Sequence, residues 1–252
     1  MTALGIKRNY YGSLCTEMYE ILHREAPQDE LAFYLSYAKK GMKILEPLCG
    51  SGRFLVPFAQ SGFWIQGVDN SAEMIEKLLQ KLPSADVVQS DIEQYRTSER
   101  FDYIFISSGS VSLFTDMQAC RGILSSIKGL LKKGGKFVFA VDTVANCGRD
   151  RNAYRVTASV HTEEDYQLIL KCKSYYDKET HTKFEPAVYE LYAGDHLLKQ
   201  EEMDFQTHLY ELGEMEALLQ EIGFTEVTVY SSFAKDLAKS NEAEMFLYEC
   251  SL

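Results

Sequence analysis

The sequence predicts an α/β protein with a doubly wound sheet of seven strands and an inserted antiparallel β lobe. Between about residues 42 and 144, short apolar segments alternate with amphipathic helices, which is typical of a parallel sheet with helices on both faces. Between about 146 and 207, apolar and polar residues alternate between polar turns, which indicates antiparallel strands with one wet face. We therefore expect an N-terminal helical segment (1–40), a sheet domain formed by 41–145 and 208–252, and the β lobe (146–207).

The N-terminal segment has the spacing of two helices. Leu14, Met18 and Ile21 recur at helical intervals, and the helix is expected to end before Pro27. A second helix follows, and Gly41 lies just beyond its end, where glycine is favoured because it adopts left-handed backbone angles.

The first predicted strand leads into a glycine turn. Ile44 and Leu45 are followed by Glu46 and then by Gly50 and Gly52, so the backbone can turn sharply and a ligand can lie against the main chain. A carboxylate before such a turn repels a pyrophosphate and attracts a cation. The third glycine of a dinucleotide fingerprint would fall at position 55, which is leucine. The turn therefore favours a positively charged ligand over NAD.

Acidic residues also follow the second and third strands. Asp69 ends the second strand, where an acid reaches the two hydroxyls of a ribose. Asp91 follows the third and can accept a hydrogen bond from the exocyclic amine of adenine, while Ile92 and Met74 can sandwich the ring. The alternatives are helix N-caps for the two acids and a core position for Met74.

The remaining elements complete the sheet. Pro57 falls inside the first helix after the glycine turn, so we expect that helix to be short or kinked. The other strands are expected at Phe101–Ser108, Lys136–Val141, Thr225–Tyr230 and Glu244–Cys250, with helices at about 123–131 and 212–222.

The sequence resembles the class I methyltransferases that use S-adenosylmethionine, a sulfonium cation. The resemblance rests on E-x-x-x-G-x-G at 46–52 and on the runs C-G-S-G-R-F, G-V-D-N-S-A-E-M-I, L-K-K-G-G-K-F-V-F and E-I-G-F-T-E-V. Within that class the chain is most similar to the small-molecule branch with an antiparallel insert after strand five. The resemblance implies a Rossmann-like fold whose last strand is antiparallel, an N-terminal helical lid, and S-adenosylmethionine as cofactor.

The resemblance also implies a set of cofactor-binding residues. Glu46 or a nearby carbonyl would hold the α-ammonium, and Tyr10, Tyr11 and Tyr19 lie in the lid. Arg53 either pairs with the methionine carboxylate or is simply exposed at the helix start. The predicted cofactor site comprises Tyr11, Glu46, Gly50, Gly52, Asp69, Asn70, Met74, Asp91, Ile92 and Ser107.

No catalytic base is evident from the sequence. An amine that enters as the free base needs no strong base, whereas a hydroxyl acceptor does. The candidates are His208, which follows the insert and should return near the strand ends, and Tyr11 in the lid. No histidine or acid cluster has metal-ligand spacing, so we expect no metal requirement.

Composition limits the partners. The net charge of −11, with no basic run, argues against nucleic acid and anionic membranes. The sequence has no stretch like a signal peptide, and the six cysteines form no C-x-x-C pair, so we expect reduced thiols and a cytoplasmic location. The tyrosine-rich insert could line an acceptor pocket or form a homodimer interface.

The expected function is methyl transfer from S-adenosylmethionine to a small molecule, with N-methylation favoured slightly over O-methylation. One alternative is a non-catalytic, regulatory protein that binds S-adenosylmethionine. The other is an NAD-dependent oxidoreductase built on the same sheet, which Glu46 and Leu55 disfavour.

Overall fold

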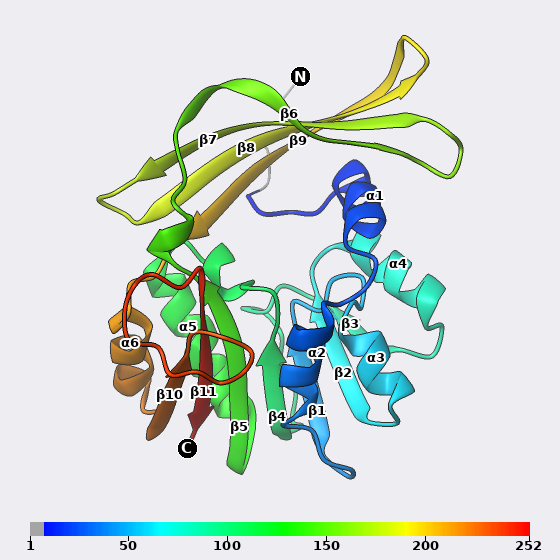
Figure 1. Ribbon diagram of the computed structural model, residues 1–252. Coiled ribbons are helices and arrows are strands. Elements are labelled where there is room, and N and C mark those ends of the chain that lie inside the picture. The colour runs from blue at the N-terminus through cyan, green and yellow to red at the C-terminus, as the bar shows by residue number, and fades with distance from the viewer. Residues whose placement is uncertain (1–7) are drawn as a thin grey trace.

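Seven strands form the main sheet, in the order β10-β11-β5-β4-β1-β2-β3 (Figure 1). This computed structural model describes residues 8–252. Neighbouring strands pair in parallel from β3 to β5, whereas β11 runs antiparallel to both β5 and β10. The predicted fold, including the antiparallel last strand, is therefore confirmed. The strands are β1 (Lys43–Pro47), β2 (Trp64–Asp69), β3 (Asp86–Gln89), β4 (Phe101–Ile106), β5 (Leu131–Asp142), β10 (Glu226–Tyr230) and β11 (Met245–Ser251).

Helices cover both faces of this sheet because successive strand residues point to opposite sides. In β4, Tyr103 and Phe105 pack with α2 and α3, while Ile104 and Ile106 pack with α5 and α6. Pro57 lies inside α3, which is only 6 residues long, so the expected short helix is confirmed. The helices are α2 (Gln28–Leu35), α3 (Leu55–Gln60), α4 (Ala72–Lys81), α5 (Met117–Leu130) and α6 (Glu214–Ile222), with 3₁₀ turns η1 (Val111–Leu113) and η2 (Val144–Asn146). Within residues 8–252, no helix has the length and apolar character needed to cross a membrane.

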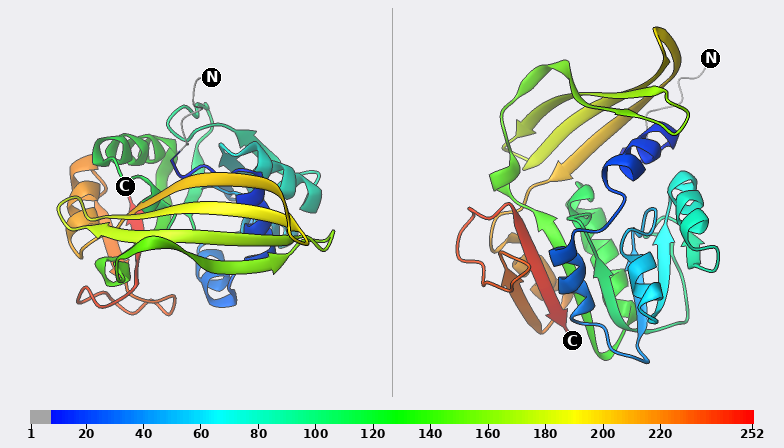
Figure 2. Two further views of the ribbon diagram at one scale, coloured as in Figure 1. Left: turned by 90° about the horizontal axis from the view of Figure 1, so that it is seen from above. Right: turned by 45° about the vertical axis from the view of Figure 1, so that its right-hand side comes forward.

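A second sheet, inserted between β5 and α6, lies across the carboxyl ends of the parallel strands (Figures 1 and 2). Its strands are β6 (Arg151–His161), β7 (Gln167–Asp177), β8 (Thr182–Ala193) and β9 (His196–His208), each antiparallel to its neighbours. The predicted antiparallel insert is confirmed.

Helix α1 (Ser13–Leu22) lies between the inserted sheet and the main domain (Figure 2). Its apolar side packs against the inner face of the sheet in a cluster that includes Leu14, Met18, Tyr189 and Met203. Its other end is tied to the main domain by an ion pair of 2.6 Å between Glu20 and Lys81 of α4. One helix therefore contacts both lobes.

Candidate active site

The site lies where the strand order reverses, between β1 and β4, as ligand sites in doubly wound sheets do. The loops after these strands contain residues with left-handed backbone angles, among them Leu48 (φ 57°) and Ser108 (φ 57°). Such angles are uncommon outside glycine and concentrate at functional loops. Both residues border a cavity of about 340 Å³.

The structure gathers nearly all of the predicted cofactor residues around this cavity. Its lining includes Tyr11, Glu46, Gly50, Asp69, Asn70, Met74, Asp91, Ile92 and Ser107. Gly52 does not line it. A Cβ at Gly52 would lie 2.2 Å from Leu78 Cδ1, and the residue has φ 79°, so its small size serves the packing of the turn against α4.

Asp69 organises the second strand end. Its Oδ2 accepts a hydrogen bond of 2.7 Å from the Gly50 N–H, and its Oδ1 accepts one of 2.9 Å from the Ser71 N–H. Burial raises the pKa of the Asp69 carboxyl, and these backbone donors oppose that rise. Beside it, Asn70 Nδ2 donates to Asp91 Oδ1 at 2.9 Å. The acids after β2 and β3 thus share one connected edge of the cavity.

Glu46 is a buried carboxylate with an unused acceptor. Its side chain is almost completely buried, and Ser107 Oγ donates to its Oε1 at 3.4 Å. Its Oε2 has no hydrogen-bond partner among residues 8–252. Burial raises the pKa of Glu46 well above its ordinary value. A buried carboxylate oxygen without a partner destabilises the fold, so a cation that contacts it in the cavity would be stabilised strongly.

Two tyrosines of the predicted lid, Tyr11 and Tyr19, line the cavity. The Tyr11 carbonyl accepts a hydrogen bond of 2.7 Å from Ser71 Oγ, and Arg53 Nη1 donates to the Tyr19 hydroxyl at 3.3 Å. Burial raises the pKa of Tyr11, so its hydroxyl keeps its proton and is poorly suited to act as a base. Tyr10 instead donates to Glu73 at 2.8 Å and does not line the cavity.

A second cavity, of about 370 Å³, lies between α1 and the inner face of the inserted sheet. It shares Tyr11 and Tyr19 with the first cavity, so the two meet at these side chains. Its lining is mostly apolar or sulfur-containing, with Arg151 and Glu185 as charged members. We call it the α1–insert cavity; its remaining residues are Cys15, Met18, Leu22, His23, Thr157, Leu170, Cys172, Ala187, Tyr189, Met203 and Phe205.

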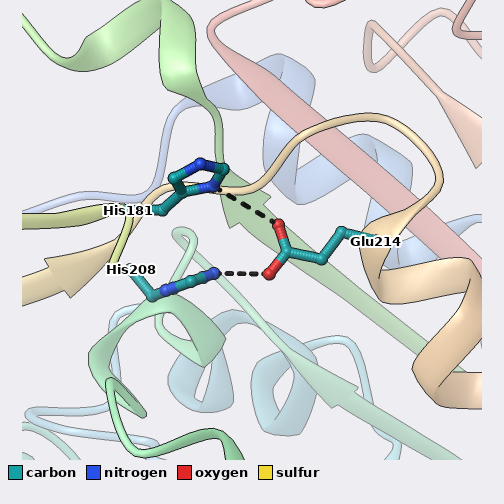
Figure 3. A group of neighbouring side chains, drawn as sticks. All are labelled: His181, His208 and Glu214. Carbon is teal, nitrogen blue, oxygen red and sulfur yellow. Dashed lines mark hydrogen bonds and ion pairs between the residues drawn. The ribbon is translucent and has the colours of Figure 1, made fainter. Parts of the chain in front are cut away.

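The structure does not bring His208 to either cavity. Its Nε2 is 2.6 Å from Glu214 Oε1, and His181 Nδ1 lies 3.9 Å from the other carboxylate oxygen (Figure 3). The three ligating atoms lie within 4.8 Å of one another, close enough to hold a metal ion. Sequence spacing missed this group because its members come from the β7–β8 turn, β9 and α6, and the expected metal independence stays untested.

Two further acids near the site escaped the sequence interpretation. Glu30 of α2 accepts the Ser108 N–H at 2.8 Å and so fixes the loop after β4, and no local pattern signals that contact. Asp142 ends β5 and contacts the same loop at Gly109. Its position at a strand end is the very signal that identified Glu46 and Asp69, and it could have been found in the same way.

Comparison with known proteins agrees with this geometry. Residues 44–135 match a family model described as a methyltransferase domain. A Geobacillus sp. (strain WCH70) protein named "Putative methyltransferase" is 23% identical over 238 residues, covering 90% of this chain and 94% of that protein.

Solved structures share the fold at low sequence identity. An S-adenosylmethionine-dependent methyltransferase from Clostridium acetobutylicum ATCC 824 superposes with a TM-score of 0.75 at 15% identity, covering 93% of this chain and 96% of that one. The sugar N-methyltransferase KedS8 from Streptoalloteichus sp ATCC 53650 gives 0.72 at 17% identity, with 100% of both chains covered.

Proposed function

The chain carries a class I methyltransferase domain that uses S-adenosylmethionine, and on that premise we propose that it methylates a nitrogen atom of a small-molecule acceptor. The observation that carries this proposal is the α1–insert cavity, which meets the cofactor cavity at Tyr11 and Tyr19. Two adjoining cavities are what a transfer between two bound small molecules requires, because reacting atoms must be held in contact and in line.

The residues present fit the cofactor. The unpartnered Glu46 Oε2 would hold the α-ammonium, and Arg53, which borders the cavity, would face the carboxylate. Asp69 would accept hydrogen bonds from the ribose hydroxyls, and Asp91 and Ile92 would contact the adenine. The cofactor supplies an activated methyl group on its sulfonium sulfur, so the protein needs only to bind, orient and exclude water.

Acidic groups favour an amine as acceptor. Glu185 lines the α1–insert cavity, where Lys183 pairs with it at 3.3 Å, and the half-buried Asp142 lies at the end of β5. Carboxylates attract an ammonium group and offset its repulsion from the sulfonium charge. The sugar N-methyltransferase with the same fold supports transfer to nitrogen. The Tyr11 hydroxyl, which keeps its proton, would orient the acceptor by donating a hydrogen bond.

The test is methyl transfer from labelled S-adenosylmethionine to a panel of small amines and alcohols of matched shape. The variant Ala187→Leu narrows the α1–insert cavity, and Val188→Leu places the same side chain on the opposite face of β8. We expect amines to be methylated, Ala187→Leu to lower kcat/KM on the order of 10-fold or more, and Val188→Leu to leave it unchanged. Both should bind S-adenosylhomocysteine normally. Methylation of alcohols alone, or equal effects of the two variants, would contradict the proposal.

We also propose that the enzyme is cytoplasmic, because all six cysteines are free, as is usual in a reducing compartment. A homodimer through the inserted sheet stays a prediction, which light scattering of the purified chain would test.

A further inference from the structure

Two histidines and a glutamate meet where the inserted sheet joins helix α6. His181 lies in the turn before β8, His208 ends β9, and Glu214 begins α6. Both rings direct a nitrogen at the carboxylate, His208 Nε2 at 2.6 Å and His181 Nδ1 at 3.9 Å (Figure 3). None of the three lines either cavity, so the proposed methyl transfer gives this cluster no role.

The backbone of the inserted sheet holds the two histidines side by side. The His181 carbonyl accepts the Leu209 N–H at 2.8 Å, and Thr182 is paired with His208 in the register of β8 and β9. His181 also has φ 51°, an angle that is uncommon for a residue with a side chain. The positions of the two imidazoles are therefore set by strand pairing and not by their mutual contact.

The surroundings leave one nitrogen of His208 to face the carboxylate. The His208 side chain is only 6% exposed, and its ring packs edge-on against Tyr210 with the centroids 4.5 Å apart. Its Nδ1 is buried without a hydrogen-bond partner among residues 8–252, so Nε2 is the nitrogen that can reach a ligand. Glu214 is held in turn by the Glu211 N–H, which donates to its Oε2 at 3.2 Å.

The donor set and the distances suit a zinc ion. Two imidazole nitrogens and a carboxylate oxygen are ligands that Zn²⁺ prefers, whereas Mg²⁺ and Ca²⁺ prefer oxygen alone. Zinc–ligand bonds of about 2.0–2.1 Å in a tetrahedron place the ligand atoms roughly 3.3 Å apart. The observed distances of 2.6 and 3.9 Å lie on either side of that value, and all three ligating atoms lie within 4.8 Å of one another. The side chains of His181 and Glu214 are 32% and 30% exposed, so they can adjust and solvent can reach the site.

We propose that His181 Nδ1, His208 Nε2 and the Glu214 carboxylate bind a zinc ion that fastens the inserted sheet to α6, although the sequence predicted no metal requirement. Water from the exposed side would complete the tetrahedron. The role is structural because the site lies outside both cavities, and it does not depend on the identity of the acceptor. Two of the ligands belong to the insert and the third to the main domain, so the ion adds a link between the two lobes.

The first experiment titrates Zn²⁺ into the full chain after treatment with EDTA. We expect one ion per chain and a melting temperature that rises by several degrees with zinc and not with Mg²⁺. His181→Ala should weaken zinc binding at least ~10-fold, the lower limit for losing even a residue that only orients a metal ligand. The exposed His196→Ala is the matched control and should bind as the wild type does. No binding, or equal affinities of the wild type and His181→Ala, would overturn the proposal.

Two further measurements identify the ligands and the role of the ion. Co²⁺ in place of zinc should give an absorption spectrum without thiolate charge-transfer bands, since all six cysteines lie outside the proposed site. Such bands would place the metal on thiols and overturn the assignment. Zinc should also slow amide hydrogen exchange in segments 178–182 and 209–216 of the wild type and not of His181→Ala. Unchanged exchange in the zinc-bound wild type would contradict the link between the insert and α6.

Discussion

The carboxylate of Glu201, on β9, accepts a hydrogen bond of 3.1 Å from the backbone N–H of Leu14 in the first turn of α1. It also accepts one of 3.2 Å from the next residue, Cys15. The N-terminal N–H groups of a helix have no partners within the helix, and an acid at that end is stabilising. Here the acid comes from the inserted sheet, so the lid helix is capped by the insert.

Removal of this cap should loosen the lid. Glu201→Ala is expected to lower the free energy of unfolding by about 1–2 kcal/mol, the usual cost of a lost N-cap. It should also weaken S-adenosylhomocysteine binding, because Tyr11 and Tyr19 belong to the lid. Thermal melting and calorimetry measure both effects. The exposed neighbour Glu202→Ala is the control, and similar losses in that variant would show that the cap is not responsible.

Substitutions at the two glycines of the turn should affect different properties: the free energy of unfolding at Gly52 and cofactor affinity at Gly50. Gly52→Ala places a Cβ 2.2 Å from Leu78 and should lower the unfolding free energy by roughly 2–4 kcal/mol. Gly50 has φ 51°, so Gly50→Ala should cost only about 1–2 kcal/mol of backbone strain. The first neighbour of a Cβ there is Met74 Sδ at 3.9 Å, and the residue lines the cavity, so this variant should chiefly weaken cofactor binding. Urea unfolding and calorimetry on both variants check this contrast, which the reverse pattern would contradict.

Glu46 is expected to lower the stability of the empty protein and to strengthen cofactor binding. Because burial raises its pKa, its charged form is destabilising in the empty protein, and Glu46→Gln should raise the melting temperature at pH 8. The same variant should bind S-adenosylhomocysteine more weakly, on the order of 10–100-fold, since the α-ammonium loses its partner. A stabilised variant with unchanged affinity would remove Glu46 from the binding site.

The stability effect of Asp142 should depend on pH. Its folded pKa of about 6 lies above the ordinary 3.8, so ionisation costs more in the folded state. Its contribution to stability is fully present below pH 3.8 and is lost as the pH rises through 6. Asp142→Asn should therefore match the wild type near pH 3.5 and exceed it by up to ~3 kcal/mol above pH 7. Urea unfolding across this range measures the difference, and a constant offset would contradict it.

Most of the residues that line the first cavity were predictable because strand ends are visible in the sequence. Glu46, Asp69 and Asp91 each follow an apolar segment, and parallel strands bring their carboxyl ends to one edge. Gly52 was assigned to the cofactor by the same pattern, yet its environment is set by Leu78 on α4, which spacing cannot reveal.

The α1–insert cavity was harder to predict because it depends on contacts between distant segments. The α1–insert cavity joins residues from positions 11 to 205, and no local pattern specifies which faces meet. His208 does return near the end of β5, since the Tyr210 N–H bonds to the Asp142 carbonyl. It lines neither cavity, because the carboxylate of Glu214 at the start of α6 holds its ring at 2.6 Å.

The α1 helix has a kinetic consequence because it forms a wall of both cavities. Displacing α1 to exchange S-adenosylhomocysteine for fresh cofactor would also remove one side of the α1–insert cavity, the proposed acceptor site. The α1–insert cavity is therefore complete only while the helix is seated. The two substrates should bind in a compulsory order, cofactor first, and the methylated product should depart before the spent cofactor.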